Sequence, residues 1–103
     1  MDRTGIILQA RLGSTRLPGK VLAPINSRTI LDHCVARLQM SGLPVVVATT
    51  DRPEDDAVER AAQRLGVDVF RGAEHDVLSR FIGAATTYGF TEIIRATADN
   101  PLV

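Results

Sequence analysis

Short apolar segments alternate with amphipathic stretches along the chain. The apolar segments are β-branched and almost continuously hydrophobic, which is typical of strands buried on both faces of a sheet. They lie at residues 4–10, 44–50, 67–70 and 91–97. This pattern predicts four short strands, separated by three stretches of another kind.

The three intervening stretches show helical periodicity. Each places apolar residues at positions i, i+1, i+4, i+5 and i+8, which form one stripe of an α-helix. The stripes are Ile30, Leu31, Cys34, Val35 and Leu38, then Ala57, Val58, Ala61, Ala62 and Leu65, then Val77, Leu78, Phe81, Ile82 and Ala85. A glycine follows each stretch, at Gly42, Gly66 and Gly89. We expect these glycines to end the helices in the left-handed conformation.

The second helix has its own start signal. Pro53 suits a first helical turn, and the acids Glu54, Asp55 and Asp56 follow it. Acidic side chains are favourable near the positive end of the helix dipole. The sequence therefore predicts a helix that begins at Pro53, with acids that stabilise its first turn. The acids that precede the third helix, Glu74 and Asp76, are interpreted in the same way.

The order of these elements indicates the fold class. Strands joined by helices of this length run parallel, and the helices cover the sheet. We therefore expect residues 1–103 to form a single α/β domain, with a three-layer α/β/α Rossmann-like parallel sheet. In such sheets, ligands bind beyond the carboxyl ends of the strands.

Composition narrows the possible function classes. The chain has 103 residues, enough for one domain, and 45% of them are hydrophobic, which argues against disorder. Twelve basic and twelve acidic residues give a net charge of zero, which argues against a nucleic-acid binder held by bulk charge. The single cysteine, Cys34, lies on an apolar stripe, allows no internal disulfide and suits a cytoplasmic protein. No apolar run approaches the ~20 residues that span a bilayer, so we expect no membrane association.

The stretch ARLGSTRLPGK, at residues 10–20, follows the first strand and carries cations without any acid. Arg11 and Arg16 can donate paired hydrogen bonds to phosphate oxygens, and Lys20 adds a point charge. The stretch is not a P-loop, because five residues separate its glycines and Val21 follows the lysine. We interpret it either as a phosphate-binding loop or as an ordinary solvated basic loop.

The ends of the other strands add further candidate residues. These are Thr49, Thr50, Asp51, Arg71, Thr97 and Asp99. Because the carboxyl ends of parallel strands meet at one edge of a sheet, we expect these side chains to lie near the basic loop. Cations from one loop and carboxylates from two others would form a site for a polyphosphate and a metal ion. For Asp51 two roles stay open: it could cap the second helix or contact the ligand.

Several motifs, in this order, resemble one enzyme family. The stretch QARLGSTRLPGKVL resembles the R-x-G-S-x-R-L-P-G-K signature of the cytidylyltransferases that activate acidic sugars, such as the acylneuraminate and 3-deoxy-octulosonate cytidylyltransferases. The stretches VVVATTDRPEDD, VFRG, DVLSRF and IIRATADNPL recur in a branch associated with spore-coat polysaccharide biosynthesis. The resemblance implies a fold of the nucleotide-diphospho-sugar transferase type. It also implies a reaction of CTP with a sugar that gives a CMP-sugar and pyrophosphate.

The resemblance further implies a set of site residues. The nucleotide-binding residues would be Ala10, Arg11, Gly13, Ser14, Arg16, Lys20, Thr50, Asp51, Arg95 and Thr97. Among these, Arg11 and Lys20 would be the catalytic cations that hold the triphosphate, with Arg16 assisting. The main chain near Ala10, with Thr50 and Asp51, would border cytosine and ribose, and Arg95 and Thr97 would line the pocket. Asp99 would hold Mg²⁺.

Members of this family are considerably longer than this chain. The resemblance therefore implies a truncated protein, the N-terminal nucleotide-binding half of a nucleotidyltransferase. The identity of the acceptor sugar stays open. A homodimer is compatible with the family pattern. Two alternatives also stay open: a nucleotide-binding module without catalysis, and an interaction fragment whose fourth strand pairs with another chain.

Overall fold

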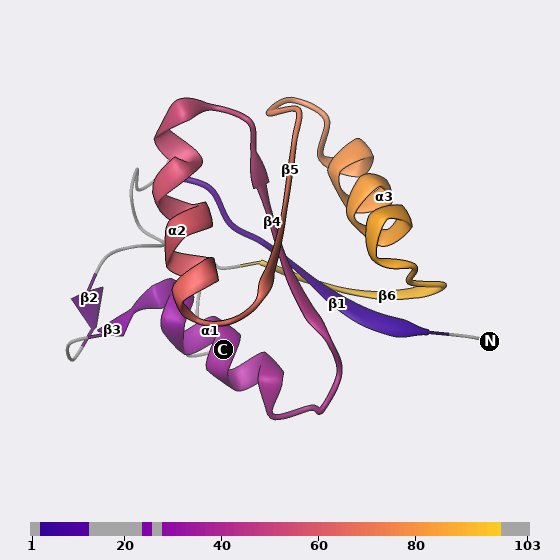
Figure 1. Ribbon diagram of the computed structural model, residues 1–103, viewed down its shortest axis with the longest axis horizontal. Coiled ribbons are helices and arrows are strands. Elements are labelled where there is room, and N and C mark those ends of the chain that lie inside the picture. Colours follow the sequence, from indigo (N-terminus) through magenta and orange to yellow (C-terminus); the bar gives the residue numbers. More distant parts are fainter. Residues whose placement is uncertain (1–2, 13–23, 26–27, 98–103) are drawn as a thin grey trace.

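A four-stranded parallel sheet forms the centre of the protein (Figure 1). The structure, a computed structural model, describes residues 3–12, 24–25 and 28–97. The sheet has the order β5-β4-β1-β6, and its strands are β1 (Thr4–Gln9), β4 (Val45–Thr50), β5 (Asp68–Gly72) and β6 (Glu92–Thr97). All three strand pairings are parallel, as the sequence predicts. A short antiparallel pair, β2 (Pro24–Ile25) and β3 (Arg28–Thr29), was not predicted.

Helices cover both faces of the sheet, which confirms the three-layer architecture. Figure 1 shows α1 (Ile30–Gln39) and α2 (Asp56–Arg64) on one face and α3 (Val77–Tyr88) on the other. Successive residues of a strand point to opposite faces, so neighbours in β1 belong to different cores. Leu8 packs with α1 and α2, whereas Ile7 packs with α3. Cys34 is buried in the first of these cores, as expected.

The ends of the helices follow local signals in the sequence. The three glycines that follow the helices, Gly42, Gly66 and Gly89, have φ angles of 79°, 78° and 72°, which confirms the predicted left-handed conformation. Asp76 caps α3 by accepting a hydrogen bond from the backbone N–H of Ser79, at 2.9 Å. Thr29 and Asp32 form a reciprocal capping box at the start of α1.

The start of α2 differs from the prediction. Residues Pro53–Asp55 form a short 3-10 helix, η2, and the α-helix begins only at Asp56. Asp55 does lie in the first turn of η2, as predicted, but its side chain is turned inward and the residue is 1% exposed. From η2, the side chain of Asp55 reaches the carboxyl ends of β1 and β4, where it contacts Leu12 and Thr50.

The predicted apolar stripe of α3 is only partly buried. Val77, Leu78 and Ile82 are 44%, 58% and 55% exposed, which contradicts the prediction. The buried face of the helix instead comprises Arg80, Phe81, Ala84 and Ala85. Two glycines permit this orientation. A Cβ atom on Gly83 would lie 2.5 Å from the Phe70 ring, and one on Gly72 would lie 3.0 Å from the Arg80 side chain. The helix is therefore positioned by close approach to β5 rather than by its whole apolar stripe.

The aromatic side chains pack in and around the core. Phe81 and Phe90 are buried, and Phe70 and Tyr88 pack against the same cluster. Within the ranges that the structure describes, no helix has the length and apolar character needed to cross a membrane.

Tyr88 should make the stability of the protein sensitive to alkaline pH. Its hydroxyl donates a hydrogen bond to the carbonyl of Val69, at 3.0 Å. Burial, together with the charge of Asp68, raises the pKa of Tyr88 above its ordinary value of 10.0. The unfolded chain therefore ionises first, and stability that is complete below about pH 10 falls as the pH rises further. Urea unfolding at pH 8 and pH 10.5 should show this loss.

Tyr88→Phe is the matched control for this pH effect. The variant lacks the ionising hydroxyl, so its stability should decline less between the two pH values. An equally steep decline in the variant would assign the effect to other groups.

Candidate functional site

The parallel sheet brings several loops to one edge. The chain leaves β1 at Ala10, β4 at Asp51 and β5 at Ala73, all at the carboxyl ends of the strands. The N–H of Ala10 donates to Ala48 at 3.0 Å, and the N–H of Asp51 donates to Gly72 at 2.9 Å. These bonds extend the sheet into the loops. For the described residues that follow β1, β4 and β5, the expectation that the loops share one edge is confirmed, and we call this edge the carboxyl rim.

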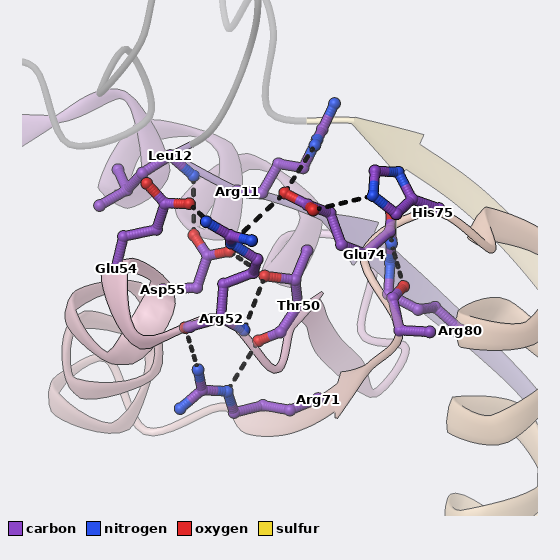
Figure 2. Close-up of polar contacts among 11 residues, drawn as sticks. Arg11, Leu12, Thr50, Arg52, Glu54, Asp55, Arg71, Glu74, His75 and Arg80 are labelled. Atoms are coloured by element: carbon purple, nitrogen blue, oxygen red, sulfur yellow. Dashed lines mark hydrogen bonds and ion pairs between the residues drawn. The ribbon is translucent and has the colours of Figure 1, made fainter.

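Asp55 is a buried bridge between two loops of the carboxyl rim (Figure 2). One carboxylate oxygen accepts the backbone N–H of Leu12 at 2.8 Å. The other accepts the hydroxyl of Thr50, which in turn accepts the N–H of Arg52 at 3.2 Å. A carboxylate that accepts such bonds is stabilised in a buried position. Asp55 therefore fixes the chain that follows β1 against the chain that follows β4.

Arg71 braces the same loop from the other side. Its Nε donates to the carbonyl of Thr50 at 2.8 Å, and one terminal nitrogen donates to the carbonyl of Arg52 at 2.6 Å. Its other terminal nitrogen pairs with Asp56 at 2.6 Å and Glu59 at 3.2 Å. The hydrogen bond to Asp56 is the main cause that raises the pKa of Arg71. Because all its side-chain nitrogens bind protein groups, Arg71 has a structural role and stabilises the carboxyl rim.

Arg80 is a buried cation beneath the rim. The residue is 1% exposed, and one terminal nitrogen donates to the carbonyls of Ala73 and Glu74, at 2.6 and 2.7 Å. Its Nε and second terminal nitrogen have no hydrogen-bond partner among the described residues. Burial, and then the positive charge of Arg11, lower the pKa of Arg80 below its usual value. Arg80 thus holds the chain after β5 and adds positive charge under the site.

Three cationic or basic side chains surround the carboxylate of Glu74 (Figure 2). Arg11 lies 3.9 Å and Arg52 lies 3.6 Å from the same oxygen, Oε2. The other oxygen, Oε1, lies 3.2 Å from Nε2 of His75, whose side chain is 94% exposed. The arginine contacts are long for ion pairs and reach solvent. This arrangement presents two guanidinium groups to an anion at the end of β1 and β4.

The predicted site residues occupy different parts of the rim. Ala10 is buried directly before Arg11, and the hydroxyl of Thr50 is engaged by Asp55. Asp51 is exposed at the end of β4, and Thr97 is exposed at the end of β6. Arg95 stacks over the ring of Phe81, 5.1 Å from its centroid. The structure therefore joins Leu12, the neighbour of Arg11, to Thr50 through Asp55, whereas Arg95 contacts α3.

Five predicted residues lie outside the described residues: Gly13, Ser14, Arg16, Lys20 and Asp99. Their roles stay predictions. Within residues 3–12, 24–25 and 28–97, no three histidine, cysteine or acidic side chains gather as a metal site. Near the rim, the described carboxylates Asp55 and Glu74 are already engaged by donors and cations. They do not fit a metal ion as they stand, so the metal assignment rests on Asp99.

Sequence reasoning missed four residues that organise the rim: Arg52, Asp55, Glu74 and Arg80. Asp55 and Glu74 were interpreted as helix-start acids because their position before an apolar stripe is typical of that role. A signal was present for Arg80, since a charged residue falls between the apolar positions of a helix that lies against the sheet.

Comparisons with known proteins identify the family of the chain. A family model described as cytidylyltransferase matches residues 5–103. The spore coat polysaccharide biosynthesis protein SpsF of Bacillus subtilis is 45% identical over 103 residues, with 94% of this chain and 43% of the relative covered. The chain therefore spans less than half the length of this relative.

Two solved structures extend the comparison. A cytidylyltransferase from Leptospira borgpetersenii superposes with a TM-score of 0.95 at 45% identity, covering 100% of this chain and 44% of that chain. A CMP:2-keto-3-deoxy-manno-octonic acid synthetase complexed with CTP gives a TM-score of 0.80 at 29% identity, covering 99% and 42% of the two chains. From its residues 5 to 103, the chain belongs to the cytidylyltransferase family.

Proposed function

We propose that this chain is the nucleotide-binding part of a cytidylyltransferase, which binds CTP with Mg²⁺ and transfers CMP to a sugar in polysaccharide precursor synthesis. The observation that carries the proposal is the place of Arg11 at the carboxyl rim, directly before Leu12, which Asp55 holds against the end of β4. Ligands of open α/β sheets bind at this edge. The synthetase of similar fold that was solved with CTP supports this choice of nucleotide.

The proposed chemistry is a displacement at the α-phosphorus of CTP. A sugar hydroxyl oxygen forms the new bond to this phosphorus, the bond to the bridging oxygen breaks, and pyrophosphate leaves while the hydroxyl proton is released. Negative charge moves toward the leaving oxygens. Arg11 and Lys20, assisted by Arg16, would stabilise this charge because fixed cations need no reorientation during the reaction.

Asp99 is the proposed ligand of Mg²⁺. It follows Thr97, the last residue of β6, by two positions, and β6 ends at the carboxyl rim. Carboxylate oxygens are the protein ligands that Mg²⁺ prefers, and the ion would neutralise phosphate charge. The remaining candidates, Gly13 and Ser14 in the basic loop and Arg95 and Thr97 on β6, complete the proposed nucleotide pocket.

Arg11→Ala should weaken the binding of CTP by about tenfold, because the variant loses one hydrogen bond between a charged group and phosphate. Isothermal titration calorimetry with CTP in excess Mg²⁺ measures the change. Arg64→Ala is the matched control, since Arg64 is an exposed arginine in the last turn of α2, at the other end of that helix from the rim. Equal affinities for the two variants would contradict the role of Arg11.

An assay of pyrophosphate release with candidate sugars separates transfer from binding alone. Release that depends on CTP and a sugar supports the transferase. Binding of CTP without release supports the alternative of a non-catalytic nucleotide-binding module. The chain spans less than half of its relatives, so the transfer activity, the sugar and the place in polysaccharide synthesis are parts of the proposal.

A second candidate function is association through β6, and the exposure of that strand favours it. Ile93 and Ile94 are 38% and 46% exposed on this edge strand, although strands of parallel sheets are normally covered. Sedimentation velocity would detect the homodimer that such pairing predicts. A monomer at all concentrations would exclude it.

A further inference from the structure

We propose that Arg52 is a second polyphosphate-binding residue, which acts together with Arg11, and that Glu74 is the counter-ion that both arginines hold in the nucleotide-free protein. This inference rests on the proposed function and deepens it. The family motifs imply that cations of the basic loop bind the nucleotide, and they assign neither Arg52 nor Glu74 a role in binding.

The first observation is that the two arginines converge on one atom. Nitrogens of Arg11 and Arg52 lie 3.9 and 3.6 Å from Oε2 of Glu74. The side chains of the two arginines are 33% and 53% exposed, so their outer donors can reach a ligand from solvent. Ion pairs of this length and exposure contribute little to stability. A ligand with more charge than one carboxylate would therefore displace Glu74 readily.

The second observation is that the main chain at Arg52 is fixed although its side chain is exposed. Its N–H donates to the hydroxyl of Thr50 at 3.2 Å, and its carbonyl accepts from Arg71 at 2.6 Å and from the N–H of Asp55 at 3.0 Å. Asp55 also holds the N–H of Leu12, the residue that follows Arg11. One buried carboxylate thus sets the positions of both arginines. Because the main chain at both arginines is fixed before binding, less entropy is lost when the ligand binds.

The third observation is a buried guanidinium group, that of Arg80, behind Glu74. Arg80 is buried and donates to the carbonyl of Glu74 at 2.7 Å, so it holds the main chain of this residue in place. The carboxylate of Glu74 therefore faces Arg11 and Arg52 with a third guanidinium behind it. The carboxylates of Glu54 and Asp55 belong to the same cluster, so a bound phosphate would take the place of Glu74 beside Arg11 and Arg52 rather than fill a charge deficit.

Arg52 also contacts Glu54, at 3.3 Å. Both residues of this pair are half-exposed, with side-chain exposures of 53% and 45%, so the contact is screened by solvent and exchanges easily. Arg52 is therefore held loosely by two carboxylates, which leaves its planar donor group available to phosphate oxygens.

The test measures dissociation constants for CTP in excess Mg²⁺ and for inorganic tripolyphosphate, which has the phosphates without the nucleoside. Arg52→Ala should weaken both ligands by about tenfold. Arg52→Lys should recover part of the loss, because it restores the charge without the paired donors. Arg64→Ala, which removes the same charge from the far end of α2, should stay within about twofold. Circular dichroism confirms that each variant is folded.

Glu74→Gln tests the counter-ion. The amide keeps the size of the side chain but removes its charge, so the arginines need not leave an ion pair when phosphate binds. We expect both ligands to bind about threefold more tightly. Unchanged or weaker binding by Glu74→Gln would overturn the counter-ion role.

The outcomes separate this inference from the proposed function. If Arg11→Ala weakens CTP binding and Arg52→Ala behaves like Arg64→Ala, the role of Arg52 is overturned and the proposed function stands. A loss for CTP without a loss for tripolyphosphate also overturns the phosphate contact. If the unaltered protein binds neither ligand, the proposed function itself is overturned.

Discussion

Asp55→Ala is expected to lower the free energy of unfolding by about 3 kcal/mol. Asp55 is 1% exposed and accepts hydrogen bonds from the N–H of Leu12 and the hydroxyl of Thr50. Alanine leaves both donors without this acceptor, and a buried donor that loses its partner carries the full desolvation penalty. Urea denaturation, followed by circular dichroism, measures the loss.

The same substitution should weaken the binding of CTP, because Asp55 positions the main chain next to Arg11 and at Arg52. Asp55→Asn should lose less stability, since the amide oxygen still accepts one hydrogen bond. Asp51→Ala removes the same charge from an exposed position four residues earlier and should change stability by less than about 0.5 kcal/mol. Equal unfolding free energies for Asp55→Ala and Asp51→Ala would show that the bridge does not stabilise the fold.

Gly5→Ala is expected to destabilise the protein by about 2 kcal/mol, although it adds only one methyl group. Gly5 lies in β1, and the ring of Phe90 lies directly against it. A Cβ atom at Gly5 would come within 2.3 to 2.4 Å of three ring atoms. Real Cβ contacts are essentially never this short, so the ring must move. Phe90 is itself buried in the core between α3 and the sheet, which resists this movement. Thermal unfolding, with the variant compared to the unaltered chain, measures the effect.

The double variant Gly5→Ala with Phe90→Leu tests this explanation. Leucine removes the ring that clashes, so the two substitutions together should cost less than their separate effects combined. Additive losses would contradict a steric cause. Gly42→Ala offers a comparison of another kind, because nothing lies within 4 Å of its Cβ position and its φ of +79° is the source of strain. Its expected cost is about 1 kcal/mol.

The sequence predicts most of the fold because each strand and helix carries a local signal. The continuous apolar runs at 44–50 and 91–97 correspond to β4 and β6 within one residue. The glycines after the helices have the expected φ angles, since only the local chain geometry decides them. The exposure of Leu78 and Ile82 was not predictable in this way. It depends on how closely α3 approaches β5, and that depends on Gly72 and Gly83 facing Arg80 and Phe70.

The site was predictable only where one segment carries the whole signal. Arg11 belongs to a basic stretch that directly follows a strand, and the structure places it at the carboxyl rim. The function of Asp55 arises instead from residues 43 positions apart in the sequence, Leu12 and Asp55, which come together only in the folded sheet. Because Asp55 closely follows Pro53, the sequence suggests only an acid at the start of a helix, and the contact with Leu12 cannot be predicted from it. Glu74 was misjudged for the same reason, because its arginine partners come from two other loops.

The braces at Asp55, Arg71 and Arg80 have a consequence for motion. Together they tie the main chain after β1, β4 and β5 to rigid elements before any ligand is present. In these described segments, adaptation to an incoming molecule therefore falls to exposed side chains such as Arg52 and Glu74. Rotamer changes of exposed side chains take picoseconds to nanoseconds, far less time than the opening of a loop. On this part of the surface, capture should therefore not wait for the backbone to rearrange.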